Sequence, residues 1–224
     1  MATKQHSPFY TVLASPALWL LSINYFFNSF VRNGITASID VLFRGAPNGA
    51  AAAANVAYEF GGAIGGLASG ALSDAVFSSR RAPAMAIFGA FLIPLPLLLP
   101  YLRGAPVAAA AAAVTFPSTL AHILYFFIGS TAFPPHVLNG LVSREVTRPD
   151  TMTAAAAFTK SAGQAGAALA EYLVISAVLS AQAAGLNAET IVWNQVARAL
   201  AIAAAISATT VMPLWNVRAY GAKM

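Results

Sequence analysis

Six long apolar stretches joined by short connections dominate this sequence of 224 residues. The stretches cover about residues 16–43, 51–73, 83–102, 116–143, 151–180 and 188–215. A helix needs about 20 apolar residues to cross the hydrocarbon core of a bilayer, and each stretch is long enough. Charged residues make up only 8% of the chain, against roughly 25% in soluble domains. The sequence therefore predicts an all-α integral membrane protein with six transmembrane helices.

The basic residues predict how these helices are oriented. Six crossings place both termini on one side of the membrane, together with the second and fourth connections. Seven basic residues fall on that side: Lys4, Arg80, Arg81, Arg144, Arg148, Arg218 and Lys223. The other side has only Arg44 and Arg103. By the positive-inside rule, both termini lie in the cytosol. We expect a cytosolic leader (1–15), a transmembrane domain (16–215) and a cytosolic tail (216–224), in a membrane that the sequence leaves open.

Several classes of function are disfavoured. The chain has no cysteine, which excludes disulfides, thiolate metal sites and a cysteine nucleophile. The net charge of +5 follows from the topology, and no basic run with interleaved aromatic residues predicts nucleic-acid binding. There is no H-E-x-x-H, no G-x-S-x-G and no cluster of metal ligands. The sequence therefore predicts no enzyme, cofactor or metal site.

Arg32 is the most informative single residue, because it lies inside the first apolar stretch. An arginine at the centre of a membrane helix costs roughly 2.5–3.5 kcal/mol, and such residues usually face a cavity or a partner. Four polar residues recur around it at intervals of four: Asn24, Asn28, Thr36 and Asp40. Helical geometry puts them along one slowly drifting face. We therefore predict that one wall of this helix is wet.

Glycine and proline residues predict how the helices pack and bend. The second stretch has five glycines, at positions 61, 62, 65, 66 and 70. Their small-xxx-small spacing favours close helix packing, and the phosphate-cradling alternative lacks the strand that such a loop follows. Prolines stand at positions 94, 96 and 100 of the third stretch and at 134 and 135 of the fourth. They predict kinks there.

Residues 70–81 read GALSDAVFSSRR, which resembles the cytosolic signature loop of the major facilitator superfamily. Extended backwards through YEFGG (58–62), the match resembles the eighth helix of the organophosphate:phosphate antiporter family, the carriers of glycerol 3-phosphate and hexose phosphates. VRNGI (31–35) is similar to that family's L-R-Y-G-[IV] in the seventh helix. Parts of 135–145 and 157–166 resemble its tenth and eleventh helices. The resemblance covers about residues 16–215 and corresponds to the C-terminal six of twelve helices.

This resemblance implies a half-bundle of two three-helix inverted repeats that exchanges a phosphorylated sugar, such as glucose 6-phosphate or glycerol 3-phosphate, for inorganic phosphate by alternating access. A second six-helix half would come from another copy, a separate chain or a missing N-terminal part. The alternative is a truncated, non-transporting relative that senses a metabolite or assembles with other chains. Ala37 replaces an acidic residue of the bacterial glycerol-phosphate carriers, which leaves the organophosphate open.

The resemblance also implies the binding residues. The family's arginine at the position of Arg32 is one of a pair that clamps the substrate phosphate, whose oxygens match the guanidinium fork. Glu59 is expected to pair with Arg32 or Lys160 or to be protonated. A pair would rearrange on loading, the alternative being a static structural pair. The predicted substrate contacts are Arg32, Glu59, Lys160, Gln164, His136, Asn139, Asn28 and Tyr58.

Three of these predictions have plain structural alternatives. Lys160 could instead snorkel to the cytosolic interface, and His136 could be a satisfied packing residue beside the proline pair. Asp74, Arg80 and Arg81 are expected to form a charge-paired gating loop that steadies one conformation. The alternative for this loop is positive-inside topology alone.

Overall fold

A computed structural model describes residues 8–43, 49–103, 116–184 and 186–217, and these ranges are helical with no strand. The elements in chain order are α1 (Pro8–Leu13), α2 (Pro16–Leu42), α3 (Ala50–Ala75), α4 (Arg81–Leu92), the 3₁₀ turn η1 (Leu95–Leu98), α5 (Leu99–Arg103), α6 (Phe116–Glu145), α7 (Met152–Ala184), α8 (Leu186–Thr210) and the 3₁₀ turn η3 (Met212–Leu214). The all-α prediction is confirmed, and each of the six apolar stretches corresponds to a long helical segment.

Three segments are long and apolar enough to cross a membrane by length and composition: residues 81–101, 152–181 and 193–214. Helices α2, α3 and α6 are of similar length, with 27, 26 and 30 residues, but they are not among the segments that are apolar enough. Composition therefore marks three spans among the described residues, and the count of six remains a prediction.

The prolines of the two affected helices act differently. In the third stretch α4 ends at Leu92, and the chain continues through η1 into α5, so the predicted interruption is confirmed. Helix α6 instead runs unbroken through Pro134 and Pro135. Since proline has no N–H, Pro134 leaves the carbonyl of Ser130 without its usual partner inside the helix.

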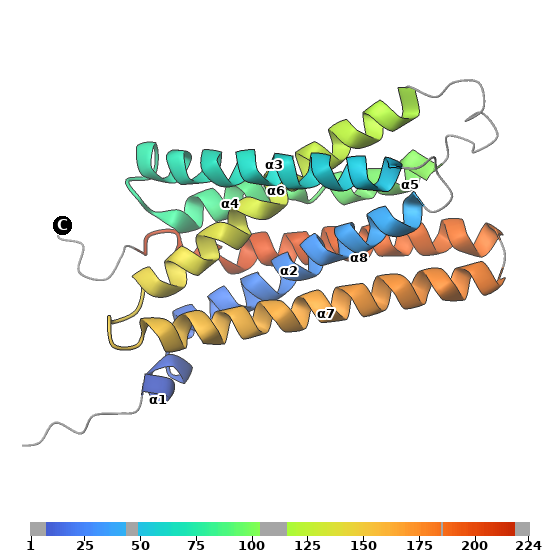
Figure 1. Cartoon of the computed structure of the whole chain (residues 1–224). Coiled ribbons are helices and arrows are strands. Elements are labelled where there is room, and N and C mark those ends of the chain that lie inside the picture. The colour runs from blue at the N-terminus through green and yellow to red at the C-terminus, as the bar shows by residue number, and fades with distance from the viewer. Residues whose placement is uncertain (1–7, 44–48, 104–115, 185, 218–224) are drawn as a thin grey trace, which may run out of the picture.

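The helices run back and forth along one axis (Figure 1). The turns that follow α3 and α6 lie at the same end of the bundle as α1 and η3. The start of α3, the end of α7 and the start of α8 lie at the opposite end. This arrangement agrees with an even number of crossings between α2 and α8.

Helices α3 and α6 touch backbone to backbone because glycine faces the contact on both sides. A Cβ atom added at Gly61 or Gly65 of α3 would overlap a carbonyl oxygen of α6. Gly129 of α6 approaches the carbonyl of Tyr58 in the same way. The predicted close packing is confirmed at these positions, whereas a Cβ at Gly70 would meet no atom within 4 Å.

Helices α2 and α7 form a second close pair. A Cβ at Gly166 would overlap the backbone oxygen of Phe26, and one at Gly163 would lie 2.5 Å from Cδ1 of Tyr25. The Tyr25 ring therefore lies close to the α7 backbone at Gly163. Each close pair, α3 with α6 and α2 with α7, supplies one wall of the region around Arg32.

The prediction of one wet wall along α2 is wrong. Asn24 and Asn28 are fully buried, and their amides hold neighbouring helices. Asn24 Nδ2 donates to the backbone oxygen of Ser207 in α8 at 2.8 Å, and Asn28 Nδ2 donates to that of Ala132 in α6 at 3.1 Å. A four-residue step turns a helix by about 40° beyond a full rotation, so four steps turn the face by about 160°. Asn24 and the exposed Asp40 therefore point in different directions.

Candidate functional site

Arg32 lies near the middle of α2, and its guanidinium is held by residues from two other helices. Its Cζ lies 4.4 Å from the centroid of the Phe133 ring of α6, a cation–π distance. Its NH1 lies 3.4 Å from Nε2 of His136, also in α6. Its NH2 lies 3.9 Å from Oε1 of Glu59 in α3. Three helices therefore converge on one cation.

The backbone of Arg32 is fixed as firmly as its side chain. The hydroxyl of Tyr58 donates to the carbonyl oxygen of Arg32 at 3.3 Å, and the hydroxyl of Thr36 donates to the same oxygen at 3.2 Å. Tyr58 is fully buried, and its ring meets Phe133 edge to face at 5.4 Å. Tyr58, a predicted substrate contact, therefore stabilises the backbone of α2 at Arg32.

Two glycines shape the surroundings of the guanidinium. A Cβ at Gly62 of α3 would lie 2.5 Å from Cδ2 of Phe133, so glycine allows this ring to lie against α3 while it faces Arg32. Gly163 of α7 gives the same freedom to Tyr25. The Tyr25 ring packs against His136 at a centroid distance of 4.7 Å and an interplanar angle of 37°, and its hydroxyl lies 3.1 Å from Nε2 of that histidine. Neither aromatic residue was predicted from the sequence.

Lys160 and Gln164 are exposed on the same face of α7, one turn apart. The charges of Lys160 and Arg32 both act on the His136 ring, which places Lys160 within electrostatic range of the cluster. Within the described parts of the chain, neither Lys160 nor Gln164 forms a hydrogen bond or ion pair. Their polar groups are therefore open to solvent or to a ligand.

Two predicted substrate contacts lie elsewhere. Asn139 is fully buried, and its Nδ2 donates to the carbonyl of Leu21 and to Oδ1 of Asn24, each at 2.9 Å. Asn28 is also fully buried, as described above. Because both amides join α2 to α6 inside the bundle, we assign these residues to helix packing and remove them from the proposed ligand contacts.

The electrostatic balance around Arg32 favours an anion. Arg32 and Lys160 supply two cations. Among the described residues, Glu59 is the carboxylate that pairs with Arg32. The Arg32–Glu59 contact is long, and the side chains are 28% and 58% exposed. An exposed pair of this kind contributes about 0–1 kcal/mol. The N–H donors on NH2 of Arg32 are therefore only weakly bound by the protein and can bind an anion.

The predicted gating loop forms a charge cluster at the C-terminal end of α3. Arg81 NH1 lies 2.5 Å from Oδ1 of Asp74, and its Nε lies 3.6 Å from Oε1 of Glu145 at the end of α6. Arg80 NH1 donates to Oδ1 of Asn216, after η3, at 3.2 Å. The cluster therefore joins the ends of α3, α4, α6 and the segment after α8.

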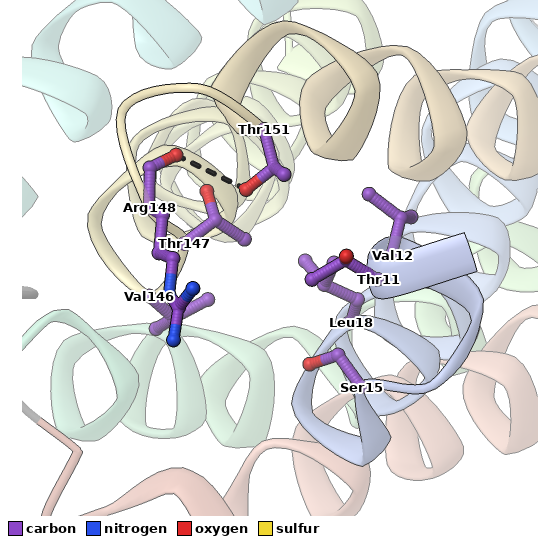
Figure 2. Close-up of a pocket in the computed structure, with 8 residues that line it drawn as sticks. All are labelled: Thr11, Val12, Ser15, Leu18, Val146, Thr147, Arg148 and Thr151. Carbon is purple, nitrogen blue, oxygen red and sulfur yellow. Dashed lines mark hydrogen bonds between the residues drawn. The ribbon is translucent and has the colours of Figure 1, made fainter. Parts of the chain in front are cut away.

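The same end of the bundle has a small hollow of about 190 Å³ (Figure 2). Eight residues of α1, the start of α2 and the α6–α7 connection line it: Thr11, Val12, Ser15, Leu18, Val146, Thr147, Arg148 and Thr151. None of the predicted substrate contacts is among them. This hollow is therefore separate from the candidate site at Arg32.

Comparisons with known proteins place the chain among membrane proteins. No family model matches it. It is 28% identical over 217 residues to the membrane sensor protein UhpC of Escherichia coli (strain K12), which covers 92% of this chain and 43% of that protein. It is also 28% identical over 211 residues to UhpC of Salmonella typhimurium, covering 93% and 43%. The chain thus spans less than half the length of the curated relatives it matches. This distant similarity and the apolar helices identify it as a membrane protein.

Proposed function

We propose that this chain binds the phosphate group of a small phosphorylated sugar at Arg32 and acts as one half of an antiporter that exchanges the sugar phosphate for inorganic phosphate. Glucose 6-phosphate and glycerol 3-phosphate are the candidate ligands. The observation that carries the proposal is a partly exposed guanidinium inside an apolar helix, fixed by three helices, whose ion pair with Glu59 is long and loose.

The energetics favour a ligand over a static structural pair. Placing an arginine in the middle of a membrane helix costs roughly 2.5–3.5 kcal/mol. The contact with Glu59 returns about 0–1 kcal/mol, because its distance is 3.9 Å and its carboxylate is largely exposed. A phosphate can offer two oxygens in parallel to the guanidinium, which is the stronger arrangement. A phosphate ligand therefore stabilises Arg32 better than Glu59 does.

The same geometry supports a sequence of events on loading. The incoming phosphate displaces Glu59 from Arg32, and Lys160 adds a second, movable cation. A phosphorylated sugar and inorganic phosphate share the group that these cations recognise, so each can replace the other. The charge cluster of Asp74, Arg81 and Glu145 then steadies one conformation of the bundle. A second six-helix half completes the site, since transporters of this architecture bind between two halves.

A second candidate function is ligand sensing without transport. The observation that favours it is the similarity to UhpC of two bacteria, which is named a membrane sensor protein. A sensor uses the same phosphate-binding residues but does not carry the ligand across the bilayer. The two functions therefore differ in flux and share the binding step.

Exchange of radiolabelled phosphate into phosphate-loaded proteoliposomes tests the proposal. The full chain is compared with Arg32→Lys and with the matched control Arg198→Lys, which alters an exposed arginine of α8. With a second copy of the chain supplying the other half, we expect exchange by the wild type and the control, competition by both sugar phosphates, and loss of exchange in Arg32→Lys. Binding of phosphate without exchange would support the sensor. Absence of binding and of exchange would refute both.

A further inference from the structure

We propose that Tyr25 and His136 form a positioning arm for Arg32, in which the imidazole is neutral, carries its proton on Nδ1 and accepts hydrogen bonds at Nε2. The arm is anchored on α7 through Gly163 and reaches Arg32 through two aromatic side chains. Neither residue touches the phosphate in this proposal. Their effect on ligand binding rests on the proposed function, but the state of the histidine does not.

The protonation of His136 follows from the chemistry of its neighbours. A guanidinium has five N–H donors and no acceptor. Its NH1 lies 3.4 Å from Nε2 of His136, so this nitrogen must be the acceptor in that contact. The Tyr25 hydroxyl at 3.1 Å then donates to the same lone pair. The remaining proton of the neutral ring must therefore be on Nδ1.

The other protonation states fit the site less well. A proton on Nε2 could be donated to the Tyr25 oxygen, but it would set two donors against each other at the contact with NH1 of Arg32. A doubly protonated ring would also place a third cation beside Arg32 and Lys160, whose charges already act on His136. The Glu59 carboxylate that could offset this charge is paired, loosely, with Arg32. The neutral Nδ1–H form is the state that gives both neighbours an acceptor.

This state leaves one buried donor, Nδ1–H, without a partner among the described residues. An unpaired buried donor costs about 1–3 kcal/mol. The common tautomer in water carries the proton on Nε2, so the site holds the ring in a form that it would not adopt alone. Arg32 selects this form because it can only donate to Nε2, and Tyr25 supports it by donating its hydroxyl to the same atom and packing its ring against the imidazole at an angle of 37°.

The arm determines which edge of Arg32 is available. His136 engages NH1, and the Phe133 ring covers one face of the guanidinium. Among the residues that the structure describes, Glu59 is the ion-pair partner of NH2, at 3.9 Å. A phosphate can therefore bind through NH2 and Nε by displacing Glu59, while NH1 stays attached to His136. Tyr25 and His136 act on the ligand through the orientation of Arg32.

The tautomer can be measured without any ligand. The chain has three histidines, so ¹⁵N-histidine labelling gives three pairs of ring signals, and His136→Gln assigns the pair of interest. At about pH 8, above the ordinary histidine pKa of about 6.5, we expect a protonated Nδ1 and a free Nε2 for His136. Tyr25→Phe is expected to shift this pair toward the Nε2–H form. A protonated Nε2 in the wild-type protein would overturn the proposal.

Equilibrium binding of radiolabelled inorganic phosphate to the purified chain supplies the second test. His136→Leu keeps the size but cannot accept a hydrogen bond, and we expect a loss of about tenfold in affinity. His136→Gln offers an amide oxygen and is expected to restore affinity to within about threefold of the wild type. Equal affinity of His136→Leu and wild type, with unchanged circular dichroism, would also overturn the arm. If the wild-type chain binds no phosphate, the proposed function fails and the tautomer measurement still decides the arm.

Discussion

Gly65→Ala is the substitution whose effect the structure defines most closely. Gly65 faces α6, and the hydrogen that a methyl group would replace points at the carbonyl oxygen of Ser130. This is the carbonyl that Pro134 leaves without its usual partner. A Cα–H···O contact from Gly65 can occupy it and contributes about 0.5–1 kcal/mol. The substitution therefore removes a contact as well as creating an overlap.

The size of the effect follows from the crowding. An added Cβ would lie 2.7 Å from Cα of Ser130, about 0.7 Å short of the 3.4 Å at which ordinary contact begins. Relief requires α3 to move away from α6, because backbone atoms cannot rotate aside. Overpacking of this kind costs about 1–3 kcal/mol, and the better helix propensity of alanine returns about 0.8–1 kcal/mol. We expect a net loss of about 0.5–3 kcal/mol in unfolding free energy.

Gly70→Ala is the matched control in the same helix, because a Cβ there meets nothing within 4 Å. We expect it to be neutral or to stabilise the protein by up to about 1 kcal/mol. The measurement is SDS-induced unfolding in mixed micelles, followed by far-ultraviolet circular dichroism. The propensity gain is common to both variants and cancels, so they should differ by the overpacking and the lost contact, about 1.5–4 kcal/mol. If they agree within about 0.5 kcal/mol, the spread expected of ordinary surface changes, the close contact of α3 with α6 is refuted.

Three further outcomes are expected. Asn139→Ala removes two hydrogen bonds between α6 and α2 and should lower the unfolding free energy by about 1–2 kcal/mol in the same assay, since such bonds average about 0.6 kcal/mol with a maximum near 1.7; no change would contradict its packing role. Glu59→Gln removes the carboxylate that competes for Arg32, so equilibrium dialysis should give a two- to fivefold higher phosphate affinity, corresponding to about 0.4–1 kcal/mol; weaker binding would argue against displacement of Glu59. Asp74→Asn breaks the ion pair with Arg81 far from the candidate site, so phosphate affinity should stay the same while the exchange rate in proteoliposomes changes; an altered affinity would contradict a purely gating role.

Much of the fold could be predicted because hydropathy alone marks long membrane helices. The stretch expected at 51–73 is α3 (Ala50–Ala75), and the one expected at 116–143 is α6 (Phe116–Glu145). The glycines at 61 and 65 also predicted a close helix contact, since only a missing side chain permits it. The partner of that contact, Ser130 and its neighbours in α6, could not be identified from spacing.

The site was harder to predict, because the spacing of polar residues does not say what they face. Asn28 and Asn139 have the spacing of a polar stripe, yet both bind neighbouring helices inside the bundle. Tyr25 and Phe133 were missed for the opposite reason, since aromatic residues are common in membrane helices and mark no site by themselves. One signal was present: Tyr25 precedes Arg32 by seven residues, two helical turns on one face.

Arg32 itself could be predicted because its cost in a membrane demands a partner. What the sequence did not reveal is how loosely that partner is held. Glu59 is more than half exposed and 3.9 Å away, whereas the backbone of Arg32 is fixed by Tyr58 and Thr36. A rigid cation with a weak ion pair is the feature from which phosphate binding is inferred.

Equilibrium dialysis of radiolabelled inorganic phosphate against the purified chain tests this inference most directly. Arg32→Lys keeps the charge but removes the bidentate fork, and Arg198→Lys makes the same change at an exposed position of α8. Phosphate binding at Arg32 predicts saturable binding by the wild type and by Arg198→Lys, and a loss of about tenfold or more in Arg32→Lys, the size expected for a charged hydrogen bond. Equal affinity of all three proteins, or no saturable binding by the wild type, would contradict it.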